Sequence, residues 1–162
     1  MSGGIGAGNG CLLPAGGPVA GRPGQPGAGT VFQAWRHVSV QEYPPEPAAV
    51  PGARRRAGHA LRAWGLGEVA DDALMALSEL LTNAVTASAG MPALPLVRVR
   101  LLADPGQLVI EVFDRADGIP EIRSPALDEV GGRGLAVVAA LARRWDWTRH
   151  RDGKIVWCDF WL

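Results

Sequence analysis

Two short stretches of alternating apolar and polar residues, joined by a turn, constrain the fold of this chain more than any other feature. They cover residues 96–102 and 108–114, and the turn between them reads ADPGQ. Side chains two positions apart point to the same face of a strand, so each stretch predicts a strand with one buried face. The apolar positions on these faces are Val97, Val99, Leu101, Leu108, Ile110 and Val112. Together the two strands predict a β-hairpin.

The rest of the chain predicts further elements that can cover this hairpin. Helix-forming residues and flanking glycines indicate helices, and alternating or β-branched residues indicate strands. The expected helices cover residues 50–64, 69–89 and 135–144, and the further strands cover residues 31–43, 145–149 and 154–162. We therefore expect an α/β (α+β) two-layer sandwich, in which helices pack on one face of a mixed, mostly antiparallel sheet.

Two segments lack such patterns. The first thirty residues are dominated by Gly and Pro and cannot bury enough apolar surface to offset the entropy of ordering them. We expect residues 1–30 to be a disordered tail and residues 31–162 to form one domain. Residues 115–133 also show no periodicity, and a connection longer than ~12 to 15 residues in a compact domain is usually functional or disordered. We expect this connection to act as a lid.

Charge and cysteine content exclude several classes of function. The 16 basic and 16 acidic residues cancel, which removes the electrostatic argument for a nucleic-acid or anionic-membrane partner. No apolar run approaches the ~20 residues that cross a bilayer, and the start does not resemble a signal peptide, so we expect a cytoplasmic protein. The two cysteines, Cys11 and Cys158, suit neither a disulfide framework nor a metal cluster. Both are expected to be reduced and structural.

The second helix brings a carboxylate and a carboxamide together in the segment SELLTNAVTAS. An apolar stripe with helical period should pack on the sheet; it consists of Ala70, Leu74, Leu77, Leu81, Ala84, Val85 and Ser88. Glu79 and Asn83 lie about 40° apart on the far side of the helix, one turn along. A solvated polar face explains this pair if the helix is taken alone.

A second polar segment, FDRADGI, follows the hairpin. Asp114 shares the parity of Ile110 and Val112, so it should point to the helix-covered face, where an unpaired carboxylate is costly. A purine amino group could be its partner, although a turn capped by Asp and Gly also explains the segment. Gly118 has no Cβ to block a flat ring and can adopt unusual backbone angles. Asp117 is a competing carboxylate whose place suits backbone capping better.

A third segment, GGRGL, leads into the last helix. Glycines at a helix N-terminus expose backbone N–H groups and the positive end of the helix dipole, which together bind phosphates. Arg133 could add positive charge there. Such glycines also serve ordinary turns, so the segment is weak evidence alone. It matches neither the Rossmann pattern nor the P-loop, and therefore indicates another kind of nucleotide site.

In this order and spacing, the three segments resemble the Bergerat-fold (GHKL) ATP-binding superfamily. They are most similar to its branch of anti-sigma factor serine/threonine kinases, related to RsbW and SpoIIAB. SELLTNAVTAS resembles the N box of this family, DRADGI its adenine box DxGxGI, and GGRGL its glycine-rich phosphate box. The resemblance runs from about residue 31 to the end of the chain.

The resemblance implies ATP and Mg²⁺ as cofactors and a role for each site residue. Glu79 would be the general base that takes the proton from a partner's serine hydroxyl. Asn83 would bind Mg²⁺ through its side-chain oxygen. Asp114 would accept a hydrogen bond from the adenine amino group, and Gly118 would let the backbone approach the base. The phosphate contacts would come from Gly132, Arg133, Gly134 and Leu135.

Four positions depart from the family pattern. Ala116 stands where the adenine box has its first Gly, and Val130 replaces the earliest Gly of the phosphate box. Ser88 follows the N box in place of a small or basic residue, and Ile155 stands where relatives commonly have Thr. These departures weaken the expectation of catalysis more than the expectation of nucleotide binding.

The sequence leaves two functions open. The first is an ATP-dependent protein kinase that binds a sigma factor or an anti-sigma antagonist and phosphorylates the antagonist. The second is a non-catalytic, nucleotide-gated module that binds a protein partner. A stand-alone histidine kinase is less expected, because His37, His59 and His150 are scattered over a strand, a helix and a turn. Any exposed tryptophan could mark a partner or homodimer surface.

Overall fold

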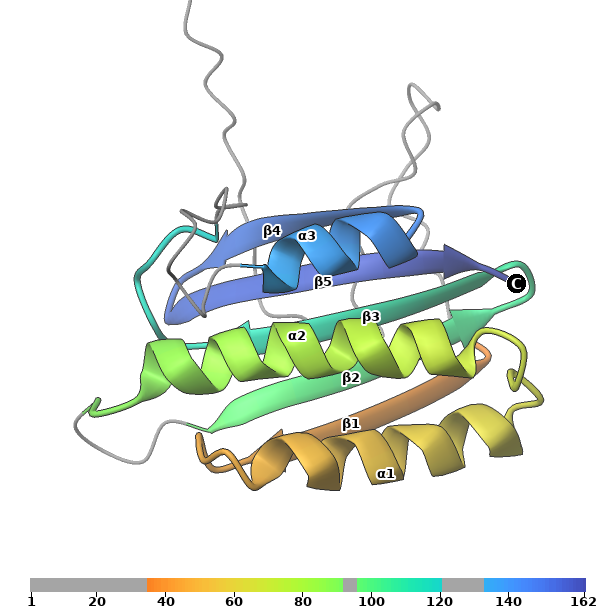
Figure 1. Cartoon of the computed structure of the whole chain (residues 1–162), viewed down its shortest axis with the longest axis horizontal. Helices are drawn as coiled ribbons and strands as arrows, with labels where there is room; N and C mark the ends of the chain where they lie inside the picture. The colour runs from red at the N-terminus through yellow and green to blue at the C-terminus, as the bar shows by residue number, and fades with distance from the viewer. Residues whose placement is uncertain (1–34, 92–95, 121–132) are drawn as a thin grey trace, which may run out of the picture.

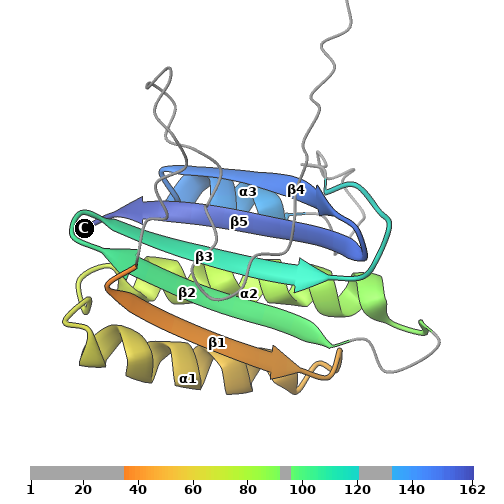
Figure 2. The same ribbon diagram turned by 180° about the vertical axis from the view of Figure 1, so that it is seen from behind.

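A computed structural model describes residues 35–91, 96–120 and 133–162, and in these parts three helices cover one face of a five-stranded sheet (Figure 1). The elements are β1 (His37–Tyr43), α1 (Ala49–Ala63), α2 (Ala70–Ser88), β2 (Val97–Asp104), β3 (Gln107–Asp114), α3 (Gly134–Leu141), β4 (Arg144–His150) and β5 (Gly153–Trp161). The strand order is β1-β2-β3-β5-β4, and every neighbouring pair is antiparallel. The view from behind shows the sheet in front of all three helices (Figure 2). The predicted α/β sandwich is confirmed.

The central hairpin forms as the alternation predicts. β2 and β3 pair from Arg98 opposite Phe113 to Asp104 opposite Gln107. Gly106 closes the turn with a φ of 90°, a left-handed conformation that glycine adopts without strain. The strands are also buried on their second face, where the cross-strand pair Leu102 and Val109 is fully buried. Alternation alone predicts only the first buried face.

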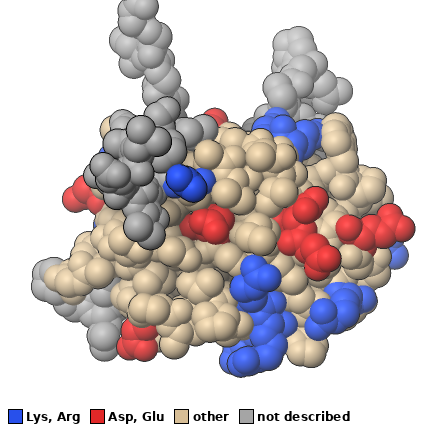
Figure 3. Space-filling view, in the orientation of Figure 1, with Lys and Arg blue, Asp and Glu red and all other residues tan. Residues whose placement is uncertain are grey.

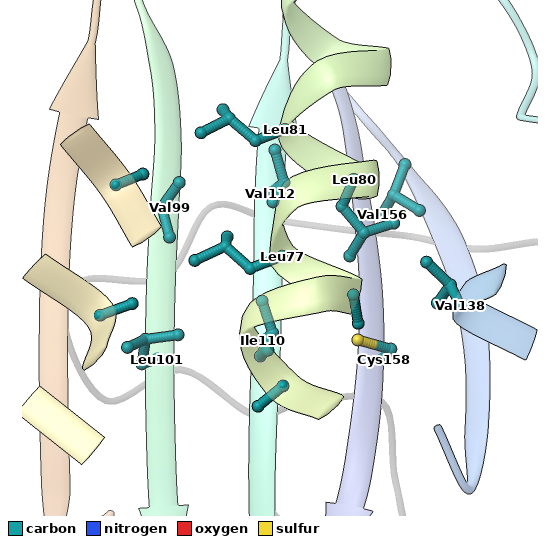
Figure 4. Packing of buried hydrophobic residues seen from close by; sticks show 14 of the residues in the cluster. Leu77, Leu80, Leu81, Val99, Leu101, Ile110, Val112, Val138, Val156 and Cys158 are labelled. Atoms are coloured by element: carbon teal, nitrogen blue, oxygen red, sulfur yellow. The ribbon is translucent and has the colours of Figure 1, made fainter. Parts of the chain in front are cut away.

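The hydrophobic core lies between α2 and the middle of the sheet. Leu77 and Leu81 on α2 lie over β2 and β3, and Leu80 lies beside Val156 on β5 (Figure 4). Full burial of each leucine contributes about 1.5–3 kcal/mol, so this interface supplies much of the stability of the fold. The buried stripe of α2 is wider than the sequence predicts. Ala73, Ala76 and Leu80 are buried in addition, because α1 and α3 flank the helix, whereas Leu74 is only partly buried.

The third helix is shorter than predicted, because long-range ion pairs hold Arg143 and Arg144 at the sheet. α3 ends at Leu141, Ala142 is extended, and β4 begins at Arg144. The fully buried carboxylate of Asp159 on β5 pairs with Arg143 at 2.5 Å and with Arg144 at 2.9 Å. Burial alone would raise the pKa of Asp159, but the hydrogen bonds from the two arginines outweigh it and lower that pKa. The carboxylate therefore stays charged and holds both arginines at the sheet.

Charged side chains on the helix face gather in separate groups, with a basic group over α1 (Figure 3). Within the run Arg54–Arg56, the first arginine is structural: Arg54 donates to the carbonyl oxygen of Leu74 at 2.9 Å and to Oγ of Ser78 at 2.5 Å. Arg55 and Arg56 are exposed. The run thus ties α1 to α2 and also presents two free charges to solvent.

Some sequence predictions concern residues outside the described ranges. The tail at 1–30, the strand residues 31–34, Cys11 and most of the predicted lid fall there. Cys158 is a buried free thiol whose pKa is raised by burial, in keeping with a structural role. In the described residues, no helix is both long and apolar enough to cross a membrane.

Candidate nucleotide-binding site

A cavity of about 490 Å³ opens between α2, the beginning of α3 and the adjoining ends of β3 and β5. This volume is within the range of small-molecule and cofactor sites. Seven of the eight predicted site residues line this cavity, namely Glu79, Asn83, Asp114, Gly118, Arg133, Gly134 and Leu135. The eighth, Gly132, lies outside the described residues. Segments that are far apart in the sequence therefore meet around one space.

The Glu79 and Asn83 pair faces the start of α3 across a very short distance. A Cβ added to Gly134 would lie 2.8 Å from Oε2 of Glu79 and 3.2 Å from Nδ2 of Asn83. Glycine at position 134 is what allows the two helices to approach here. Glu79 is partly buried and Asn83 is exposed, so both remain accessible from the cavity. This helix face is therefore not a plain solvated surface.

The N-terminus of α3 provides the positive end of the site. The helix begins at Gly134, its N-cap residue Arg133 makes no side-chain capping bond, and no acidic residue lies in its first turn. The first N–H groups of a helix have no partner within the helix. Together with the helix dipole and the guanidinium of Arg133, they form a region suited to an anionic group.

Asp114 lies at the end of β3, beneath the cavity, and is only 2% exposed. Its Oδ1 accepts hydrogen bonds from the backbone N–H of Ala116 at 2.9 Å and from Nζ of Lys154 at 2.7 Å. Burial raises the pKa of Asp114, and these two donors offset part of that effect. The pocket therefore contains a carboxylate that is held in place and only partly satisfied.

Lys154 is a charged cavity residue that sequence reasoning missed. It is paired with Asp114 in the sheet register and donates a second hydrogen bond to the carbonyl oxygen of Ala116 at 2.9 Å. Parity along β5 was the available signal, because Lys154 shares a face with Val156 and Cys158. Ile155 stands where relatives commonly have Thr. It lies on the opposite face of the strand beside Phe113 and does not line the cavity.

The turn after β3 contains two of the singled-out positions. Gly118 lines the cavity and a Cβ there would meet open space; its φ is not positive, so its backbone conformation does not require glycine. Ala116 is buried and fits in the turn, with both its backbone polar groups bonded to the Asp114 and Lys154 pair. Asp117 is exposed and pairs with Arg149 at 3.8 Å. Of Asp114 and Asp117, it is therefore Asp114 that lies at the cavity.

The oxygen atoms of the cavity fit Mg²⁺ bound together with a phosphate ligand. Among the described residues, no group of three or more His, Cys, Asp or Glu side chains is placed to hold a metal ion. Mg²⁺ usually takes one or two protein oxygens and fills its remaining positions with phosphates and waters. The exposed amide of Asn83, beside the N-terminus of α3, can supply such an oxygen.

Comparison with known proteins identifies the family of this chain. A model of the histidine kinase-like ATPase domain matches residues 43–160. The chain belongs to this family. No curated protein matches the sequence. Among solved structures, this chain is similar to the histidine kinase domain of the blue-light activated histidine kinase from Erythrobacter litoralis EL346. The two are 25% identical, and the match covers 68% of this chain and 60% of that one with a TM-score of 0.47.

Proposed function

We propose that this ATPase-like domain is an ATP-binding regulatory protein of the anti-sigma type, which phosphorylates a serine of a protein antagonist and sequesters a sigma factor. One observation carries the proposal: a single cavity joins the Glu79 and Asn83 pair, the uncapped N-terminus of α3 and the buried carboxylate of Asp114. Family membership supports nucleotide binding and a kinase or ATPase class. The serine specificity and the anti-sigma role come from the resemblance of the three sequence boxes.

Each end of the cavity suits one part of ATP. The carboxylate of Asp114 can accept a hydrogen bond from the exocyclic amino group of adenine, and the open space over Gly118 can admit a flat ring. The first N–H groups of α3 and the guanidinium of Arg133 suit the phosphates. Asn83 would hold Mg²⁺, which neutralises phosphate charge when it is bound.

Glu79 is placed to act as a general base. In the proposed reaction, the serine oxygen of the partner attacks the γ-phosphorus, the bond from that phosphorus to the β,γ-bridging oxygen breaks, and ADP leaves. Glu79 takes the proton of the serine hydroxyl. Its carboxylate lies next to Gly134, at the end of the cavity assigned to the phosphates. Two of the three histidines are engaged in ring contacts, since His37 stacks on Trp64 and His150 packs against Phe113. The third, His59, is exposed on α1 and does not line the cavity.

A second candidate is a nucleotide-gated binding module without turnover. Ala116 and Val130, which depart from the glycines of the family's boxes, motivate it. The buried turn at Ala116 is bonded to Asp114 and Lys154, which keeps the base end of the cavity in place. This candidate predicts that ATP controls partner binding while no phosphate is transferred.

Replacing Asn83 with alanine tests the nucleotide assignment. In the presence of Mg²⁺ we expect ATP affinity to fall at least about tenfold, or about 1.4 kcal/mol, because the metal loses its protein oxygen. Without Mg²⁺ the wild type and the variant should bind ATP equally weakly. The matched control is Asn83→Asp, which keeps an oxygen ligand and should retain Mg²⁺-dependent binding. Calorimetric titration measures both effects. If ATP affinity is the same with and without Mg²⁺ and is unchanged in Asn83→Ala, the assigned site is wrong.

A further inference from the structure

A buried ion pair forms one wall of the cavity where β3 meets β5. Lys154 is 5% exposed and Asp114 is 2% exposed, and their charged atoms Nζ and Oδ1 are 2.7 Å apart. Burying two charges is costly, so such a pair is weak evidence for a purely stabilising role. Both residues line the cavity. A base bound against Asp114 would therefore meet Lys154 as well.

Counting hydrogen bonds shows what this pair still offers to a ligand. The ammonium of Lys154 has three N–H donors, of which two are used, one to Oδ1 of Asp114 and one to the carbonyl oxygen of Ala116. Asp114 accepts both of its hydrogen bonds on Oδ1 and none on Oδ2. One donor and one acceptor, next to each other, remain unused at the cavity wall.

A neighbouring donor and acceptor match the edges of two kinds of purine. Adenine presents its amino group as a donor beside the ring acceptor N1. Guanine and hypoxanthine present the reverse, an acceptor at O6 beside the donor N1–H. A carboxylate alone would favour adenine. It can accept the amino N–H of adenine, whereas the O6 of a 6-oxopurine, a stronger hydrogen-bond acceptor than adenine N1, would be left beside it without a donor. With an ammonium beside it, the carboxylate can accept a hydrogen bond from the N1–H of a 6-oxopurine, while the ammonium donates a hydrogen bond to O6.

We propose that Lys154 is a specificity-determining residue that lets this base site accept GTP and inosine triphosphate as well as ATP. The inference rests on the proposed function, because it assumes that a nucleotide base binds at Asp114. The two hydrogen bonds of Lys154 hold it at Asp114 and Ala116. We therefore expect the ammonium of Lys154 to contact the base and not the triphosphate.

Titrating the full chain with ATP, GTP and inosine triphosphate in the presence of Mg²⁺ tests this inference. The wild type should bind all three with Kd values within about tenfold of one another, a spread of about 1.4 kcal/mol. Lys154→Met removes the donor but keeps the length of the side chain, and should weaken GTP and inosine triphosphate at least about tenfold more than ATP. Lys154→Arg keeps a donor and should preserve the wild-type ratio.

Other outcomes overturn the inference. A wild type that binds ATP but rejects both 6-oxopurines by more than about a hundredfold contradicts it, and so does a Lys154→Met variant that weakens all three nucleotides equally. Both results would leave the proposed function in place. If the wild type binds none of the three nucleotides, the proposed function fails together with the inference. Circular dichroism checks the fold of Lys154→Met. If that variant does not fold, the inference is tested by the ratio of the three Kd values in the wild type and in Lys154→Arg.

Discussion

Replacing Gly153 with alanine is expected to prevent the chain from folding stably. The added Cβ would lie 2.0 Å from the backbone oxygen of Asp114 and 2.8 Å from Cα of Arg115, and the φ of 154° at Gly153 is one that other residues rarely adopt. Neither neighbour is a flexible side chain, so β5 would have to move away from β3. We expect a loss of more than about 3 kcal/mol, out of the ~5–15 kcal/mol that stabilises a typical domain.

Urea denaturation of Gly153→Ala measures this loss. Gly52→Ala is the matched control, because Gly52 lies inside α1 and a Cβ there would meet nothing within 4 Å. Alanine favours helix over glycine by about 1 kcal/mol, so the control should equal or exceed the wild type in stability. A Gly153→Ala variant with wild-type stability would show that β3 and β5 do not approach as described.

Replacing Glu79 with glutamine is expected to abolish most phosphate transfer while ATP still binds. Glutamine has nearly the same shape but cannot take a proton, and a positioned general base contributes ~10²–10⁴-fold to the rate. The expected loss is therefore about 3–5 kcal/mol of transition-state stabilisation. The affinity for Mg²⁺-ATP should change only a few-fold, because binding is assigned to other residues.

The measurement is transfer of labelled γ-phosphate to an anti-sigma antagonist from the source genome. Glu68→Gln is the control, since Glu68 is an exposed carboxylate that precedes α2 and does not line the cavity. Equal rates in Glu79→Gln and the wild type would exclude Glu79 as the base. ATP-dependent partner binding with no transfer by either protein would instead select the non-catalytic module.

Local sequence patterns predicted most of the fold, because the spacing of apolar residues along one strand or helix decides which of its faces is buried. The alternation of β2 and β3 and the helical period of α2 depend only on neighbouring residues, and all three elements form close to the predicted positions. The early end of α3 was not predictable in this way. It depends on the pairing of Arg143 and Arg144 with Asp159, a residue fifteen or more positions away. The extra buried residues of α2 likewise depend on the neighbouring helices.

The site was predictable as a set of residues but not as a geometry. The one-turn spacing of Glu79 and Asn83 placed them on one helix face, and parity placed Asp114 toward the helices. Their convergence with Gly134 depends on packing between α2 and α3, which no local pattern contains. Lys154 was missed because its contact with Asp114 depends on the register that sets the two residues opposite each other. The role of each residue came from the family resemblance, and remains a prediction.

A crystal structure of the chain with Mg²⁺ and a non-hydrolysable ATP analogue tests the central claim most directly. The account predicts that the purine contacts Asp114, that the phosphates meet the first N–H groups of α3, and that Mg²⁺ is bound by Asn83. A nucleotide found outside the cavity lined by Glu79, Asp114 and Gly134, or one bound within it in the reverse orientation, would contradict it.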